Sequence, residues 1–427
     1  MDYVVAVQAP AYWLSPTRFA TESAFAEHLR ELRRAVGPEF ERLVLVAPRF
    51  DDATYAAQRD HLGIVDLEAD GIQFLPAHPH TSSRLGFWRH HARQTWRTAR
   101  TAVATAGVVH SGLSTELGRP MLAMVNLAAW LAQRPVVFVV DIDFRRHSWH
   151  YYKLGRWSLK SFLVNRFVYD PMKWLQVWLA PRMFELVLLK SATMVEDFGG
   201  GRPNVKNFYD TAHGVDAVLS AAALSERLRW IVEPQRPLHI AFFGRLVDYK
   251  GLDRVIEAVR LAREQGADVR LSLIGAGDRL DSLRRQASDS GLKDVVAFLP
   301  PVRYGDDLFR LLADVHVSVA APLVEDTPRA AFDSMARGLP VVAFDITYFR
   351  DLARASGAVA LVAWPQAAAL AGEFVRLARD RSRLAAMSEH AVAFARENTQ
   401  SRWLEQRTQW MRQLVLPKRR VAAHEQR

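Results

Sequence analysis

The chain of 427 residues is long enough for two domains of about 200 residues each, and half of it (50%) is hydrophobic. It contains no cysteine, which excludes a disulfide scaffold, a cysteine-ligated metal site and a cysteine nucleophile. Lys and Arg number 56 against 46 Asp and Glu, so the net charge of +10 predicts an anionic substrate or partner. We expect a cytoplasmic protein, because neither a membrane-spanning apolar run nor a signal peptide is recognisable.

The first half of the chain alternates between buried strands and helices. The predicted strands are Tyr3–Val7, Leu43–Val46, Gly107–Val109 and Val136–Val140. A helix with Phe25, Leu29 and Leu32 on its apolar face follows the first of them. Strands that are apolar throughout indicate a parallel sheet covered on both faces. The proline-containing segment Glu233–Pro237 is then interpreted as a linker.

One segment of this half, Arg84–Lys190, contains the whole excess of positive charge. It has sixteen Lys and Arg against five Asp and Glu, together with seven of the twelve tryptophans. A helix predicted over Arg84–Thr105 would align four arginines, Arg89, Arg93, Arg97 and Arg100. Such a surface suits solvent, nucleic acid or a membrane, but no nucleic-acid-binding fold surrounds it, so we expect no nucleic acid partner. We favour an anionic membrane surface, which attracts Lys and Arg and accommodates Trp.

The pattern of strands and helices starts again after the linker. The predicted strands are His239–Phe243, Val269–Ile274, Val295–Phe298, Val315–Val319 and Val341–Phe344. We expect two doubly wound, Rossmann-like α/β domains that face each other, with the carboxyl ends of both sheets at one cleft. The predicted division is an acceptor-side domain at 1–232, a donor domain at 238–395, a helix at 396–415 that returns to the first domain, and a basic tail at 416–427.

Two turns of the second domain begin with glycine. Gly244 follows the first strand, and Arg245 and Lys250 come after it, before the next predicted helix. A tight turn with two cations beside a helix N-terminus suits a diphosphate, although a solvated basic loop is an equally good interpretation. Gly275 opens a second turn, but Leu280 stands where the dinucleotide fingerprint has its third glycine, so NAD binding is disfavoured.

The most informative segment of the second domain is 324–343. Glu325 lies in the loop after a strand, Pro328 suits the first turn of the next helix, and Asp333 lies about one and a half turns inside it. The free backbone N–H groups near Thr327–Ala330 suit a phosphate, and the two carboxylates suit sugar hydroxyls. Either acid by itself also fits the cap of a helix.

In their order and spacing, these motifs at residues 238–345 resemble the donor domain of the retaining GT-B glycosyltransferases of family 4. The resemblance rests on Gly-Arg-Leu and Lys-Gly, on Ile-Gly-x-Gly, and on an acid-x7-acid element followed by Ala-x-Gly-Leu-Pro-Val-Val. It implies that Arg245 and Lys250 hold the donor diphosphate and that Glu325 contacts the sugar. Asp333, where the family usually has Glu, would bind the ribose. The implied donor site also includes Gly244, Gly275, Thr327, Pro328 and Arg329.

The first domain matches the family less closely. The glycine pair that usually follows the first strand is missing, and Arg18–Ser23 occupies that region. The family's His-x-His appears as His110-Ser111-Gly112, so His110 is a fourth catalytic candidate beside Arg245, Lys250 and Glu325, although a lone histidine at a strand end is more often structural. Asp141 and Asp143 copy the Asp-x-Asp of GT-A glycosyltransferases. A charged strand end is the better interpretation, and acceptor binding is the functional alternative.

We predict no metal site and no cofactor, because the histidine pairs 78/80, 90/91 and 147/150 lack a further ligand at zinc spacing. The resemblance implies a metal-independent retaining glycosyltransferase that moves a sugar from a nucleoside diphosphate sugar to a glycan or lipid-linked acceptor. We expect it to act in cell-surface polysaccharide or glycolipid synthesis, bound peripherally to the inner face of the membrane. Two alternatives stay open: another GT-B enzyme such as a sugar-nucleotide epimerase, and a non-catalytic protein that binds a glycan or a nucleic acid.

Overall fold

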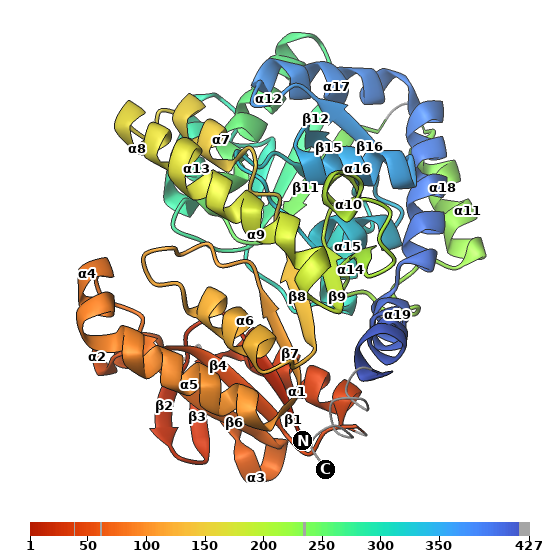
Figure 1. Cartoon of the computed structure of the whole chain (residues 1–427). Helices are drawn as coiled ribbons and strands as arrows, with labels where there is room; N and C mark the ends of the chain where they lie inside the picture. Colours follow the sequence, from red (N-terminus) through yellow and green to blue (C-terminus); the bar gives the residue numbers. More distant parts are fainter. Residues whose placement is uncertain (38, 60–61, 234–235, 418–427) are drawn as a thin grey trace.

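The computed structural model describes residues 1–37, 39–59, 62–233 and 236–417. Two large parallel sheets, each with helices on both faces, make up most of the molecule (Figure 1). Both are doubly wound, which confirms the predicted α/β class. The basic residues Lys418, Arg419 and Arg420 of the predicted tail lie outside the described residues.

The first sheet has seven strands, and every neighbouring pair is parallel. In spatial order they are β10 (Val205–Asn207), β9 (Leu186–Leu189), β8 (Val136–Val140), β7 (Ala106–Gly112), β1 (Asp2–Ala6), β4 (Leu43–Arg49) and β6 (Ile72–Pro79). Four of them, β1, β4, β7 and β8, correspond to the predicted strands. The strand order reverses between β1 and β7, which is where ligands of such sheets bind.

Helices connect these strands and cover the sheet. They are α1 (Ser23–Val36), α2 (Asp52–Gln58), α3 (Leu67–Asp70), α4 (Arg84–Gly86), η2 (Phe87–His91), α5 (Ala92–Thr105), α6 (Met121–Leu131), α7 (His147–Lys153), α8 (Leu159–Val164), η3 (Asn165–Tyr169), α9 (Asp170–Met183), α10 (Ala192–Gly199) and α11 (Ala221–Ile231). The helix predicted over Arg84–Thr105 is formed by α4, the π-helical turn η2 and α5 in direct succession. The segment from α8 through η3 to α9 is likewise continuous.

A small antiparallel sheet, which the apolar patterns do not predict, is attached to the first half. Its strands are β2 (Tyr12–Ser15), β3 (Arg18–Glu22) and β5 (Leu62–Asp66). Phe19 of β3 and Val65 of β5 are buried in the same core as Tyr3 and Leu29. The region that has a glycine pair in the resembled family is therefore a strand here, and its side chains help to form the core.

The second sheet has six strands, again all parallel. In spatial order they are β13 (Val296–Leu299), β12 (Val269–Ile274), β11 (Leu238–Phe243), β14 (Val317–Ala320), β15 (Val341–Phe344) and β16 (Val359–Val362). The accompanying helices are η4 (Asp248–Lys250), α12 (Leu252–Glu264), α13 (Leu280–Asp289), α14 (Asp306–Leu312), α15 (Ala330–Ala336), α16 (Thr347–Ser356), α17 (Ala367–Arg379) and α18 (Arg381–Glu397). The strand order reverses between β11 and β14.

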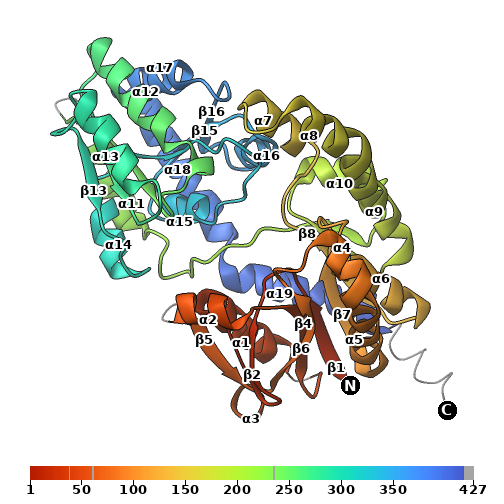
Figure 2. The same cartoon turned by 90° about the vertical axis from the view of Figure 1, so that its left-hand side faces the viewer.

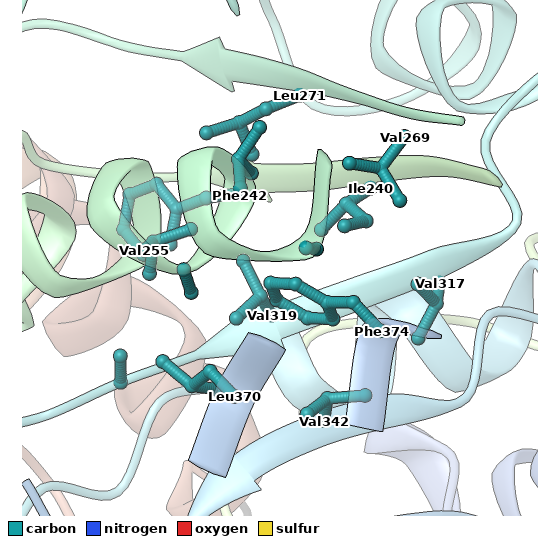
Figure 3. Packing of buried hydrophobic residues seen from close by; sticks show 14 of the residues in the cluster. Ile240, Phe242, Val255, Val269, Leu271, Val317, Val319, Val342, Leu370 and Phe374 are labelled. Atoms are coloured by element: carbon teal, nitrogen blue, oxygen red, sulfur yellow. The ribbon is translucent and has the colours of Figure 1, made fainter. Parts of the chain in front are cut away.

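The core of this half lies between the sheet and its helices. Figure 3 shows Ile240 and Phe242 of β11 close to Val319 of β14, with Leu370 and Phe374 of α17 packed beneath them. All five side chains are buried. Burying apolar side chains of this size contributes about 1.5–3 kcal/mol each, so the packing holds the strand ends in fixed positions.

Among the contacts that join the two halves of the molecule, three involve whole helices or buried polar groups. The last helices, α19 (Gln400–Trp410) and η5 (Met411–Val415), return to the first half, and Figure 2 shows α19 beside it. Met411 and Val415 are buried there in the same core as Tyr3. Helix α11 belongs to the first half of the chain but packs on the second half, because its Ile231 is buried in the core of the second sheet. At the third contact, the buried Asp351 of α16 accepts hydrogen bonds from Ser191 and Thr193 at the start of α10.

Within the described ranges, no helix is both long and apolar enough to cross a membrane.

Candidate active site

A cavity of about 310 Å³ opens where β11 and β14 end, at the point of strand-order reversal in the second sheet. Five of the predicted donor-binding residues line it: Gly244, Arg245, Lys250, Pro328 and Arg329. The chain therefore brings together two segments that lie about eighty residues apart. This is the place where parallel α/β sheets bind their ligands.

The glycines of the turns allow the two backbone segments to touch. Gly244 and Gly275 both have positive φ angles, +140° and +147°. A Cβ atom on Gly275 would lie 1.9 Å from the carbonyl oxygen of Gly244, so any larger residue would push the two turns apart. Gly275 thus supports the turn that carries Arg245, and it does not itself line the cavity.

The two predicted cations are placed differently. Lys250 Nζ lies 2.5 Å from a carboxylate oxygen of Asp326, and both side chains are largely buried. Arg245 donates a hydrogen bond of 3.1 Å to the hydroxyl of Tyr249 and is otherwise directed to solvent. The backbone N–H of Thr327 donates a hydrogen bond of 3.0 Å to Asp326, and Thr327 is not among the residues that line the cavity. An incoming diphosphate would meet a guanidinium that is bonded to a neutral hydroxyl and a lysine that is already paired with a carboxylate.

Glu325 is buried and holds the first turn of α16. One of its oxygens accepts hydrogen bonds from the backbone N–H and the hydroxyl of Thr347, at 3.1 and 2.9 Å. Burial raises the pKa of Glu325 to about 7, against the opposing effect of the Thr347 N–H, and the nearby charge of Asp143 raises it further. In this structure the carboxylate acts as a helix cap, which was the alternative interpretation of this acid.

Asp333 is also buried, and it lies in the first turn of α15 rather than one and a half turns inside the helix. The reason is that Pro328 and Arg329 precede the helix, which begins at Ala330. One oxygen of Asp333 accepts a hydrogen bond of 3.1 Å from the hydroxyl of Tyr304. Burial raises the pKa of Asp333 to about 6.

His110 lies at the carboxyl end of β7 and lines two further cavities, of about 330 and 600 Å³. The smaller one also contains Arg329 of the donor cavity, so it connects the two halves of the molecule. The ring nitrogen Nδ1 of His110 is 3.0 Å from the Tyr3 hydroxyl. Desolvation lowers the pKa of His110 to about 3, so the imidazole is neutral at pH 7. It can therefore orient a hydroxyl group but carries no charge.

The two aspartates after β8 have different environments. Asp143 is buried and forms a two-pronged ion pair with Arg145, with contacts of 2.9 and 2.6 Å. Asp141 is 66% exposed and lines the larger cavity, where Lys190 lies 3.5 Å away. Of the pair, Asp141 is available to an acceptor, whereas Asp143 is occupied by its arginine. In the described part of the chain no group of three or more His, Asp or Glu side chains could hold a metal ion.

The sequence of the second half matches a known family, described as "Glycosyl transferases group 1", over residues 225–394. These residues form a group 1 glycosyltransferase domain. A curated relative, the "Amylovoran biosynthesis glycosyltransferase AmsK" of Erwinia amylovora, is 33% identical over 152 residues, which cover 34% of this chain and 37% of that protein. The chain thus spans only about a third of this relative's length in the alignment.

Solved structures resemble the whole chain, not only the group 1 domain. HepE of Anabaena, crystallised with UDP, has a TM-score of 0.62 and 19% identity, with 97% of this chain and 100% of that chain covered. WaaG, "a glycosyltransferase involved in lipopolysaccharide biosynthesis", has a TM-score of 0.60 and 12% identity, with 95% and 98% covered. At such identities the likeness concerns the fold. The chain has the GT-B fold, which confirms the predicted architecture, and the match over residues 225–394 confirms the predicted family resemblance.

The sequence motifs did not identify several residues of the cleft that faces the group 1 domain. Lys190 is buried at the end of β9, between Asp141 at 3.5 Å and Asp210 at 3.6 Å. Arg407 of α19 reaches the same place and lies 4.0 Å from Asp210. For Lys190 the signal is a lysine directly after an apolar strand. For Arg407 no local signal exists, because only the return of the last helix brings it to this cleft.

Proposed function

We propose that this protein is a retaining glycosyltransferase that transfers a sugar from a nucleoside diphosphate sugar to a glycan or lipid-linked acceptor. The observation that carries the proposal is the cavity of the group 1 domain, where Gly244, Arg245, Lys250, Pro328 and Arg329 meet at the reversal of strand order. The names of its relatives, which refer to amylovoran and lipopolysaccharide biosynthesis, support a role in cell-surface polysaccharide or glycolipid synthesis.

In this proposal, the protein mainly positions the reactants and stabilises the leaving group. The bond between the sugar carbon C1 and the diphosphate oxygen breaks, and a bond from C1 to the acceptor oxygen forms on the same face. The proton of the acceptor hydroxyl passes to the departing diphosphate, so no protein base is required. Arg245 and Lys250, which line the cavity, stabilise the charge that develops on this diphosphate.

The acceptor would lie against the first sheet. Asp141 is the exposed carboxylate of the larger cavity, and neutral His110 borders both this cavity and the one that contains Arg329. The hydroxyl groups of a glycan suit these hydrogen-bonding partners. The acceptor oxygen would therefore approach the donor sugar from the side of β7 and β8.

A donor screen with and without acceptor tests the proposal. UDP-glucose is the first donor to examine, because HepE has been crystallised with it. We expect at least one nucleotide sugar to raise the melting temperature and to be consumed when membrane glycolipid extract is added. Conversion of the donor sugar without any acceptor would favour an epimerase, and the absence of nucleotide binding would favour the non-catalytic alternative.

We further propose that the protein binds peripherally to an anionic membrane through its first half. Arg89, Arg93, Arg97 and Arg100 are all exposed on η2 and α5, as the predicted helix required. A second surface, which we call the α8–α9 face, carries nine exposed large apolar side chains: Leu159, Leu163, Val164, Phe167, Val168, Met172, Trp174, Leu175 and Trp178. Residues 144–184 contain eight Lys and Arg and a single acid, the buried Asp170. Both features suit an interfacial position.

Vesicle co-sedimentation tests the membrane proposal. The triple variant R89Q/R93Q/R97Q should bind vesicles that contain phosphatidylglycerol at least tenfold more weakly at low salt. The matched control R270Q/R285Q/K293Q removes three exposed cations of the second half and should bind like the wild type. Equal pelleting with neutral and anionic vesicles, unaffected by salt, would contradict the proposal, because attraction to headgroups is screened within about 8 Å at physiological ionic strength.

A further inference from the structure

A polar cavity of about 550 Å³ lies apart from the donor cavity, beside the α8–α9 face. Three segments line it: the loop before α4, the loop before α6, and the helix from η3 to α9. Its charged residues are Arg84, Glu116, Arg119 and Lys173, and hydroxyl and amide groups make up most of the remaining surface. Three cations against one carboxylate make this a site for an anion.

The walls of this cavity are held together by hydrogen bonds. Arg119 donates to the carbonyl oxygen of Ser82 at 3.1 Å and pairs with Glu116 at 2.7 Å, which neutralises the one carboxylate. Gln176 of α9 exchanges hydrogen bonds with both backbone groups of Ser114, at 3.1 and 3.2 Å. The cavity is therefore preformed by three segments that are distant in the chain.

Arg84 is the cation that a ligand can neutralise, and Lys173 lines the cavity near it as a paired cation. Arg84 donates to the hydroxyl of Tyr169 at 3.0 Å, and within the described ranges it forms no ion pair with a carboxylate. Lys173 is buried, with Asp170 at 3.4 Å as its partner. The stem of Arg84 lies over Gly118, where a Cβ atom would come within 2.6 Å of it. The glycine thus leaves room for the guanidinium to reach the cavity.

Exposed apolar side chains lie close in sequence to Arg84 and Lys173. Leu85, which follows Arg84, is 66% exposed, and Phe167, two residues before Tyr169, is 71% exposed. Trp88 and Met172 are exposed as well. A soluble anion would leave these apolar side chains exposed to water, whereas the hydrocarbon chain of a lipid would cover them.

The polar cavity also adjoins the cavity in which we place the acceptor. Thr115 and Lys173 line both it and the 600 Å³ cavity that contains His110 and Asp141. That cavity shares His110 with the one that includes Arg329 of the donor site. Neighbouring cavities thus lead from the exposed apolar surface to the group 1 domain.

We propose that the polar cavity binds the diphosphate of a membrane lipid that carries the acceptor sugar, with the lipid chain on Leu85, Trp88 and Phe167. The inference rests on the proposed function, since it names the acceptor class of that transfer. Arg84 and Lys173 bind the diphosphate, and the attached glycan extends past Thr115 towards His110. The site would place an acceptor hydroxyl at the donor sugar while the lipid stays in the membrane.

Farnesyl diphosphate is a soluble probe for this site, and saturating UDP keeps it out of the donor cavity. We expect it to bind the wild type in calorimetry. Arg84→Ala should weaken this binding at least tenfold, and Gly118→Val should do so by displacing the arginine stem. The matched control Arg285→Ala, an exposed arginine of the second half outside the cavity, should change the affinity less than twofold. Inorganic diphosphate, which lacks the chain, should bind at least tenfold more weakly than farnesyl diphosphate.

Three results would overturn the inference: no binding of farnesyl diphosphate, equal affinity for inorganic diphosphate, or equal affinity of the Arg84→Ala variant. UDP binding to the same preparations separates this failure from that of the proposed function. If UDP binds and farnesyl diphosphate does not, only the lipid site is wrong. If neither UDP, GDP nor ADP binds, the proposed transfer fails first.

Discussion

The carboxyl ends of the two sheets face the same cleft, yet they are built in different ways. At the second sheet, Gly244, Arg245 and Lys250 follow one strand, and Pro328 and Arg329 follow the neighbouring one. At the first sheet, Asp141, Lys190 and Asp210 come from three strand ends, and Arg407 comes from the last helix. The diphosphate group is the same in every nucleoside diphosphate donor, so short sequence motifs are enough to form its proposed site. Under the proposed function the residues of the first sheet bind the acceptor, and because acceptors differ from enzyme to enzyme, this proposed site is assembled by the tertiary structure.

The largest effect should follow from removing the two donor-side cations. Arg245→Ala and Lys250→Met should each lower turnover several tens-fold, because each loses a charge-assisted contact of about 1.5–3 kcal/mol to the leaving diphosphate. Initial rates with a saturating donor measure the loss. Arg285→Ala and Lys293→Met, exposed cations of the same half outside the cavity, are the matched controls. Full activity in both test variants would remove the diphosphate role.

The acids of the group 1 domain should differ from each other. Glu325→Gln should reduce transfer about tenfold or more, because the family resemblance implies that its carboxylate contacts the sugar and because it also holds α16. Asp333→Glu should keep most of the activity, since it restores the residue usual in the resembled family. The opposite result, a silent Glu325→Gln and an inactive Asp333→Glu, would show that this element has been assigned wrongly.

The stability of the contact between the two halves should depend strongly on Asp351. Its carboxylate accepts hydrogen bonds from Ser191 at 2.6 Å and from the Thr193 backbone at 3.1 Å, in a buried position. Asp351→Ala leaves these donors unpaired and should lower the free energy of unfolding by about 3 kcal/mol or more. Asp345→Ala, which breaks a half-exposed ion pair with Arg350, should cost about 1 kcal/mol or less in the same urea titration. Equal losses would mean that this contact is not specially stabilised.

Stability should depend on pH through Glu325. Because its folded pKa of about 7 lies above the ordinary value of 4.5, the folded state binds the proton more tightly. The contribution of Glu325 to the free energy of unfolding is fully present below pH 4.5 and is lost as the pH rises through 7. Relative to Glu325→Gln, the wild type should therefore lose up to about 3 kcal/mol between pH 4.5 and 8 in denaturant unfolding. A constant difference between the two proteins would contradict the raised pKa.

The smallest effects should lie on the acceptor side. Asp141→Asn should raise the KM for the acceptor several-fold and leave the donor affinity within twofold, because its exposed carboxylate faces only the first sheet's cavity. Asp143→Asn should act on the melting temperature instead, since it disrupts the buried pair with Arg145. An unchanged acceptor KM in Asp141→Asn would move the acceptor site elsewhere in the cleft.

Most of the fold was predictable because apolar strand runs and helix periodicity are local signals. The antiparallel sheet of β2, β3 and β5 was not, since its short strands alternate weakly and gain stability only by packing on the core that contains Leu29. The donor motifs were predictable by resemblance, but the partners of their residues were not. That Lys250 pairs with Asp326, and that Glu325 caps α16, depends on which loops the two sheets bring together.

The pair formed by Lys250 and Asp326 allows the most direct test of donor binding. A K250M variant alone leaves Asp326 unpaired, so the double variant K250M/D326N separates a diphosphate contact from simple neutralisation of the carboxylate. Calorimetric titration with UDP, GDP and ADP should find at least one that binds the wild type, and the double variant should fold normally but bind it at least tenfold more weakly. Equal affinity in the double variant, or no nucleoside diphosphate bound by the wild type, would contradict a donor diphosphate held by Lys250 in the group 1 domain.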